Sequence, residues 1–391
     1  MKVKKLIKGL ALVLVMSMGL ACLAACGGSN SGGTEKSSGE AQQSQEEASE
    51  KEKESDAASE DASEKESVKE KETEKESEKD DSGEKPEEVT LNVAYMPNYT
   101  SLVEVVTAME IGAFDEEGIK INLVEFADGP TIISAMENGS INVGFIGSGA
   151  HKLAINGAAK IFCFAHLGNA DAVMGLKSHD VTKAEDLAGK KVGYAPGTSS
   201  EAILKQTLES ADLTMDDIQP MQMDASGIVS AMVSGSLDAC ALWSPSSIAV
   251  KEELGEDIVE ISNNTTFKDQ SASVESWIVM DDYAKENRDI LLRFTRALMK
   301  AKTFRADPDN YKQISEWIAD QTGLDAELLY KERESAEWLT ADELKEQLKD
   351  GSIKKLYESQ QRAFIEDGSV EKEVPIEDYV MFDLMLEAAG E

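Results

Sequence analysis

Residues 191–208 read KVGYAPGTSSEAILKQTL, and this stretch decides how the rest of the chain is interpreted. Residues 191–194 read as a short buried strand, and residues 195–197 have the composition of a tight turn. Thr198 then precedes an amphipathic helix, and Glu201 lies at the spacing of a capping box. A helix start carries free N–H groups and partial positive charge, which suit an anionic or polar ligand. The same residues are also explained by a helix cap alone.

Similar junctions of strand, turn and helix recur along the chain. The expected strands are 90–95, 119–126, 141–146, 161–165, 172–176, 191–194, 218–223, 239–243 and 276–280. The expected helices among them are 101–109, 130–137, 148–156, 182–187, 198–208, 226–234 and 245–254. Residues 262–271 read as a polar loop, and almost everything after residue 281 has a helical pattern. Alternation at this spacing predicts an α/β fold with parallel strands.

The first 26 residues resemble a bacterial lipoprotein signal. Four lysines precede an apolar run, and the sequence LAAC at 23–26 has the form of a lipobox. The resemblance implies a signal peptide over 1–25, cleavage before Cys26, and a lipid on that thiol that holds the protein to the membrane on its extracytoplasmic face. An ordinary secretory signal or a short membrane anchor is the alternative, although the apolar run is short for a spanning helix.

Residues 26–88 have the composition of a disordered tether. From 34 to 88 there are 22 acidic and 9 basic side chains, with Val68 as the one sizeable aliphatic residue. Such a segment buries too little apolar surface to offset the entropy of ordering. Subtracting the signal and the tether from the total charge of −36 leaves −27 on the remaining part. This excess of negative charge argues against nucleic acid or an anionic membrane surface as a partner.

The few cysteines and histidines favour neither a metal site nor a disulfide. Cys163 and Cys240 lie inside apolar runs, where they are expected to be buried small hydrophobic residues. His151, His166 and His179 are scattered along the sequence. We therefore expect no metal and no cofactor.

Four motifs carry a family resemblance. They are DGPTIISAMENGSINVGFIGSG (128–149), AEDLAGKKVGYAPGTSS (184–200), GSLDACALWSP (235–245) and SWIVMDDYAKEN (276–287). Over about residues 89–306 the chain resembles the substrate-binding proteins of ABC importers in the aliphatic sulfonate, nitrate and taurine group.

The resemblance implies a type II periplasmic-binding-protein fold, in which two lobes joined by two crossover strands close around a small solute. Mapped here, the crossovers are 172–176 and 276–280. Lobe 1 is then 89–176 together with 276–391, and lobe 2 is 177–275. The implied protein is a monomer that is not an enzyme and that delivers its solute to an ABC permease.

The binding site is expected where helices follow the carboxyl ends of strands. The turns there offer small residues, hydroxyls, amides and one indole. The resemblance carries the following residues over as ligand-binding: Met96, Asn98, Gly129, Thr131, Gly147, Ser148, Thr198, Ser199, Asp224 and Trp243. Trp243 is expected to form a wall against the organic part of the solute. Asp224 is expected either to accept a hydrogen bond from the solute or to cap the helix after it.

Two features bear on the solute. The family often has an acidic residue where this chain has Ser244, and the first arginine of the chain is Arg288, so no candidate turn offers a guanidinium. The absence of an arginine fork disfavours an amino-acid carboxylate and fits a sulfonate or a neutral ring. A sulfonate-like solute is favoured, although the acidic body offers an anion no steering. Nitrate, bicarbonate and a thiamine-precursor pyrimidine are alternatives, as is an enzyme on the same fold, which would need a nucleophile–base pair or a metal in the cleft.

Overall fold

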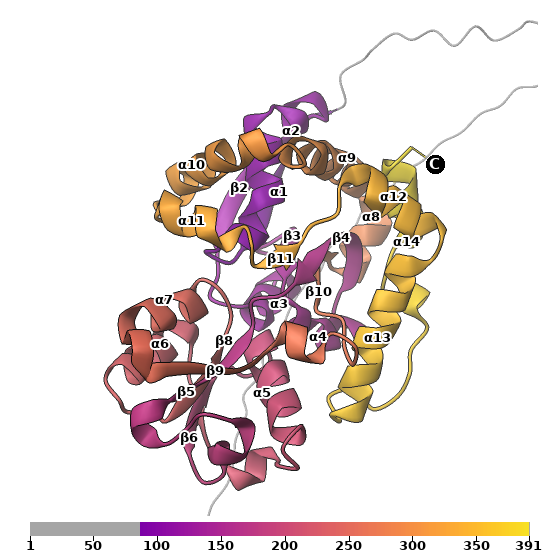
Figure 1. The fold of residues 1–391 in the computed structure, drawn as a ribbon. Helices are drawn as coiled ribbons and strands as arrows, with labels where there is room; N and C mark the ends of the chain where they lie inside the picture. The colour runs from indigo at the N-terminus through magenta and orange to yellow at the C-terminus, as the bar shows by residue number, and fades with distance from the viewer. Residues whose placement is uncertain (1–86, 391) are drawn as a thin grey trace, which may run out of the picture. The chain divides into compact units, whose positions relative to one another are not determined.

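The computed structural model describes residues 87–390. The expected signal peptide, the lipidated Cys26 and nearly all of the expected tether lie outside the described residues. The described part has an α/β architecture with two sheets (Figure 1).

The larger sheet has six strands in the order β11-β4-β10-β3-β1-β2. Their bounds are β1 (Val89–Tyr95), β2 (Ile119–Glu125), β3 (Val143–Ile146), β4 (Lys160–Gly168), β10 (Val274–Val279) and β11 (Ala336–Glu337). Strand β1 pairs in parallel with β2 and β3, as the alternating pattern predicts. Strand β10 runs antiparallel to both β3 and β4, so the sheet is mixed rather than parallel throughout.

The smaller sheet has five strands in the order β7-β6-β8-β5-β9. Their bounds are β5 (Ala172–Leu176), β6 (Lys191–Tyr194), β7 (Gln219–Gln222), β8 (Ala239–Leu242) and β9 (Ile258–Asn263). Strand β9 was not predicted; the sequence suggested only a polar loop beginning at residue 262. It reads IVEISN, without strict alternation, and it pairs antiparallel with β5 at the edge of the sheet.

Strand pairing differs from expectation at both expected crossovers. Residues 172–176, expected in lobe 1, form β5 and pair only within the smaller sheet, with β8 and β9. Residues 274–275, expected in lobe 2, begin β10 of the larger sheet. The chain passes between the sheets at 169–171 and at 264–273 instead. Residues 172–176 lie inside the smaller sheet because all five residues of this apolar strand are buried there, between β8 and β9.

The helices begin close to the predicted positions. Those between the strands are α1 (Tyr99–Glu110), α2 (Ala113–Glu116), α3 (Gly129–Glu137), α4 (His151–Ile155), α5 (Ser199–Glu209), α6 (Ala225–Val233) and α7 (Ser246–Leu254). Single 3-10 turns form at η1 (Ser148–Ala150), before α4, and at η3 (Ala184–Leu187), where a helix was expected.

The C-terminal helices pack on the larger sheet and on α1. They are α8 (Asp281–Glu286), α9 (Arg288–Arg305), α10 (Tyr311–Thr322), α11 (Ala326–Glu332), α12 (Ala341–Lys349), α13 (Ser352–Glu366) and α14 (Phe382–Ala388). Helices α9 and α10 contact α1, while α14 contacts α9 and β4 (Figure 1). Within residues 87–390, no helix combines the length and the hydropathy that a membrane span requires.

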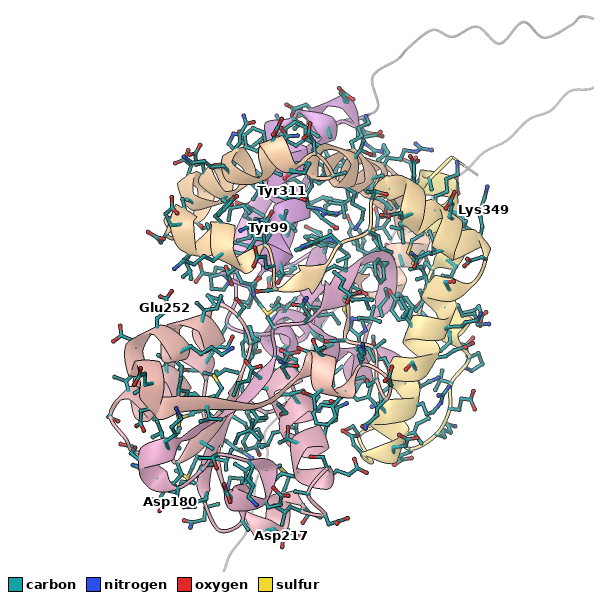
Figure 2. The ribbon with its side chains drawn as sticks, viewed as in Figure 1. Tyr99, Asp180, Asp217, Glu252, Tyr311 and Lys349 are labelled. Carbon is teal, nitrogen blue, oxygen red and sulfur yellow. The ribbon has the colours of Figure 1, made fainter. Side chains whose placement is uncertain are left out.

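The core of the larger sheet encloses an ion pair. Lys302 and Glu104 are both buried and in contact, and the Trp277 indole donates to the second oxygen of Glu104 at 3.1 Å. Lys302 also donates to the carbonyl of Ala165 at 2.7 Å. Figure 2 shows how densely side chains fill the space between the helices and the sheets. Cys163, in the same core, and Cys240, in the smaller sheet, are free and buried, which confirms their expected role.

Candidate functional site

The strand-end turns of the two sheets meet face to face. Gly149 follows β3 of the larger sheet, and Thr198 precedes α5 of the smaller sheet. A Cβ atom added to Gly149 would lie 2.0 Å from the carbonyl carbon of Thr198 and 2.3 Å from the backbone nitrogen of Ser199. Only a glycine permits this approach of one backbone to the other.

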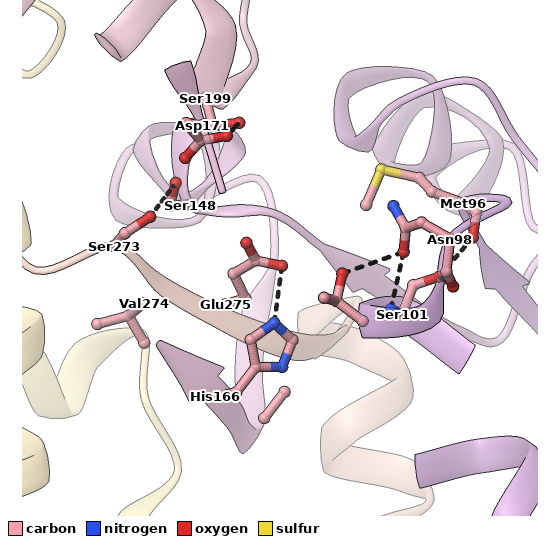
Figure 3. Close-up of polar contacts among 12 residues, drawn as sticks. Met96, Asn98, Ser101, Ser148, His166, Asp171, Ser199, Ser273, Val274 and Glu275 are labelled. Carbon is pink, nitrogen blue, oxygen red and sulfur yellow. Dashed lines mark hydrogen bonds and ion pairs between the residues drawn. The ribbon is translucent and has the colours of Figure 1, made fainter. Parts of the chain in front are cut away.

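A carboxylate in the first crossing segment ties the same turns together. Asp171 is buried and accepts a hydrogen bond from Ser199 Oγ at 2.6 Å (Figure 3). It also accepts from Asn264 Nδ2 at 2.8 Å, and Asn264 belongs to the second crossing. Burial raises the pKa of Asp171 to about 6, and the hydrogen bonds oppose that rise. Asp171 therefore joins both crossing segments to the start of α5.

A small cavity lies beside this contact. Its volume is about 40 Å³, enough for a few water molecules. Both sides of the molecule contribute to its wall: Met96, Asn98, Thr100, Asp128, Gly129, Gly147, Ala150, Gly168, Ala170, Asp171, Thr198, Ser199, Trp243, Ser244, Glu275 and Ser335.

Seven of the ten predicted ligand-binding residues line this cavity. They are Met96, Asn98, Gly129, Gly147, Thr198, Ser199 and Trp243. Their contact with a solute stays a prediction, but turns separated by up to 147 positions in the sequence do share one wall.

The other three predicted residues lie elsewhere. Thr131 is exposed in the first turn of α3 and donates its backbone N–H to Asp128. Ser148 is buried and accepts from Ser273 Oγ at 3.0 Å (Figure 3). It lines a separate, larger pocket. Asp224 is exposed and caps α6, where it accepts from the backbone N–H of Gly227 at 2.7 Å. The structure thus gives Asp224 the capping role of the two that the sequence allowed.

Capping and cavity lining coincide at three helix starts. Asn98 caps α1, Asp128 caps α3 and Thr198 caps α5 through their side-chain oxygens. The predicted capping box at α5 forms in a different way: Glu201 accepts from the backbone N–H of Gly197 at 2.7 Å, and also from Lys152 at 2.9 Å. The positive φ of Gly197, 78°, makes this turn possible.

Glu332 is a residue near the site that the sequence reasoning missed. It is buried at the end of α11, where one oxygen accepts from Ser244 Oγ at 2.8 Å and the other from the backbone N–H of Tyr99 at 3.1 Å. Burial raises the pKa of Glu332 to about 7, against the effect of these two donors. Ser244 therefore contacts a carboxylate from a distant helix, and no local sequence pattern signals this contact.

Glu275, at the start of β10, was also missed. Glu275 lines the cavity, and one oxygen of its carboxylate lies 3.2 Å from Nε2 of the buried His166 (Figure 3). A Cβ atom on Gly168 would lie 2.5 Å from the other oxygen, so a glycine at the end of β4 makes room for the carboxylate.

Two named relatives align with 60% or more of this chain. A binding protein of Brucella abortus (strain 2308) is 29% identical over 301 residues, which cover 76% of this chain and 92% of the relative. The taurine-binding periplasmic protein of Escherichia coli (strain K12) is 22% identical over 238 residues, 60% of this chain and 72% of the relative.

Solved structures share the fold. The alkanesulfonate-binding protein SsuA of Xanthomonas axonopodis pv. citri, bound to MOPS, matches with a TM-score of 0.58 at 20% identity, covering 75% of this chain and 99% of that one. The nitrate-binding protein NrtA of Synechocystis PCC 6803 matches with a TM-score of 0.59 at 12% identity, covering 78% and 90%.

The family itself follows from the sequence profile that matches residues 99–310, more than half of the chain. The profile covers most of both sheets and every predicted binding residue except Met96 and Asn98. The chain belongs to the NMT1/THI5-like family.

Proposed function

We propose that this chain is the extracytoplasmic solute-binding component of an ABC importer, which captures a small polar solute between two lobes and passes it to a permease. The observation that carries the proposal is the meeting of Gly149 with Thr198 beside a cavity to which both sheets contribute. Two bodies joined by two short crossings can close on a solute by a hinge motion. The relatives with binding-protein names fit the same role.

Binding fits the cavity better than catalysis does. Among the described residues that line it there is no histidine and no cysteine. Ser199 with Asp171 is a hydroxyl–carboxylate pair in which both residues line the cavity, but Asp171 also accepts from Asn264 and so connects the two crossing segments. The desulfurization enzyme DSZB matches with a TM-score of 0.54 at 16% identity, and it shares the fold alone.

The solute that we propose is sulfonate-like. Relatives are named for taurine and for aliphatic sulfonates, and one structural neighbour is named for nitrate. The starts of α1, α3 and α5 lie at the cavity, and the partial positive charge of a helix start favours an anionic head group. Nitrate, bicarbonate and a thiamine-precursor pyrimidine are the competing solutes.

We further propose that a lipid on Cys26 anchors the mature protein, as a monomer, at the extracytoplasmic face of the membrane. The LAAC sequence supports this proposal. Incorporation of radiolabelled palmitate into the wild-type chain, with none into Cys26→Ser, is the expected result. Equal labelling of both proteins would contradict the proposed anchor.

The test of solute binding is a thermal-shift screen of sulfonates, taurine, nitrate, bicarbonate and aminopyrimidines, followed by solution scattering with and without each positive compound. Binding to the folded state raises the melting temperature by mass action. Trp243→Ala should abolish the shift, whereas Trp317→Ala, on α10 and outside the cavity wall, should retain it. Superimposable scattering profiles would contradict closure, and an unchanged shift in Trp243→Ala would remove this residue from the site.

A further inference from the structure

The wall of the cavity is negatively charged. Asp128, Asp171 and Glu275 line it, and no lysine or arginine does so among residues 87–390. Two of these carboxylates have a structural role that uses their oxygens. Asp128 caps α3, and Asp171 accepts from Ser199 and Asn264.

Glu275 is different because its carboxylate accepts no hydrogen bond within the described part of the chain. Its side chain is only 13% exposed. Nε2 of His166 is 3.2 Å away but does not complete a hydrogen bond, and both ring nitrogens of this fully buried histidine are without a partner. Figure 3 shows the Glu275 carboxyl group between His166 and the region of Asp171 and Ser148.

A solute that is only an anion fits this wall poorly. It would bring another negative charge into a confined site beside a carboxylate that already lacks donors, where charges interact more strongly than in water. A protonated amine has the opposite effect, because it supplies N–H donors and an opposite charge to the same oxygens. The start of α5 remains for a polar or anionic group elsewhere on the solute, because the hydroxyls of Thr198 and Ser199 already donate to the carbonyl of Ala195 and to Asp171.

We infer that the solute carries a protonated amino group, which binds against the Glu275 carboxylate. The inference rests on the proposed solute-binding function and adds to it that the solute, whatever its other group, bears an amine. His166 acts as a positioning residue, since its ring backs the carboxylate from the core side. Gly168 keeps the space for the carboxylate open.

The experiment is a titration of the full-length chain with pairs of probes that differ only in an amino or a hydroxyl group. The pairs are 2-aminoethanesulfonate with 2-hydroxyethanesulfonate, 1,4-diaminobutane with 1,4-butanediol, and 5-aminomethyl- with 5-hydroxymethyl-4-amino-2-methylpyrimidine. In at least one pair the amino member should bind about tenfold or more tightly than its hydroxyl partner, the size expected of one charge-assisted contact. The pair that shows the difference also identifies the rest of the solute.

Glu275→Gln should lower the affinity of that amino probe about tenfold or more and leave the hydroxyl probe within about twofold to threefold. Glu253→Gln, an exposed position on α7 with the same change of charge, should alter neither. Melting curves establish that each variant is folded. Hydroxyl members that bind as tightly as the amino members would overturn the inference while supporting solute binding. An absence of binding by all six probes would overturn the proposed solute class together with this inference.

Discussion

The core of the larger sheet and the cavity between the sheets both bury carboxylates, but they treat the charge differently. In the core, Glu104 contacts the ammonium of Lys302 and accepts from Trp277. Asp171 and Glu275 line the cavity and Glu332 lies near it; all three are buried or nearly so, and none contacts a lysine or an arginine within residues 87–390, the nearest basic group being the His166 ring 3.2 Å from Glu275. A compensated carboxylate stabilises a fold or is neutral to it, whereas an uncompensated one carries a cost that a ligand can relieve.

The largest effect on stability is expected from removing the cation that pairs with the buried carboxylate in the core. Lys302→Met leaves Glu104 buried without its cation, and the expected loss in the free energy of unfolding is about 3–5 kcal/mol. Urea unfolding followed by circular dichroism measures it. Lys300→Met is the matched control, because its ion pair with Glu116 is exposed and such pairs contribute under about 1 kcal/mol.

The double variant Lys302→Met with Glu104→Gln should recover much of that loss, since no unpaired charge then remains in the core. If Lys302→Met and Lys300→Met lose the same free energy, the core ion pair is not the compensated charge described above.

At the contact between the sheets, the test is to add side-chain volume, whereas in the core it is to remove a charge. Gly149→Ala places a methyl group within 2.3 Å of the Thr198 carbonyl, so the two turns must separate. We expect a cost of about 1–3 kcal/mol in the free energy of unfolding, a larger radius of gyration by solution scattering, and loss of the ligand-induced thermal shift. Gly147→Ala, whose added methyl meets nothing within 4 Å, is the control for stability and radius. A compact Gly149→Ala protein would contradict the tight contact.

The sequence predicted what local patterns encode. Strands β5 and β6 have the expected bounds, and Thr198 caps α5 as its position indicated. Seven of the predicted turn residues share a cavity because helices that follow parallel strands begin at the same sheet edge. The capping role of Asp224 could not be separated from binding, because the same Asp is suited to both.

The sequence could not predict what depends on distant pairing. Strand β9 pairs with β5, which is distant in sequence, and its own residues IVEISN lack the alternation that signals a strand. Glu275 and Glu332 reach the region of the cavity from β10 and α11, far from the turns on which the sequence reasoning concentrated. Strand–turn–helix patterns identify cavity edges, but they do not reveal which charges the tertiary fold adds.

The cost of a buried carboxylate that has no lysine or arginine partner can be tested at Glu332. Its pKa is about 7 in the folded protein against an ordinary 4.5, so the folded state holds the proton more tightly. The resulting stabilisation is present below pH 4.5 and is lost as the pH rises through about 7. Glu332→Gln removes the titration and keeps a donor for Ser244 and an acceptor for the Tyr99 N–H.

We therefore expect the free energy of unfolding of Glu332→Gln, measured by urea unfolding, to exceed that of the wild type by roughly 1–3 kcal/mol at pH 8. At pH 4 the two proteins should differ little. Glu327→Gln, exposed on the same helix, should follow the wild type at both values. A Glu332→Gln protein that is less stable than the wild type at pH 8 would show that the charged form is the one the fold requires.

The smallest expected effect separates a carboxylate that only caps from one that also lines the cavity. Asp224 and Asp128 make equivalent cap bonds, to Gly227 at 2.7 Å and to Thr131 at 2.9 Å, but only Asp128 is on the cavity wall. Replacement of either by Ala should cost about 1 kcal/mol of stability through loss of the cap. Only Asp128→Ala should also change solute affinity, and by no more than a few fold, because its carboxylate already has a partner. Equal changes in affinity for both variants would mean that the capping of α6 is coupled to the site, since Asp224 itself has no contact with the cavity.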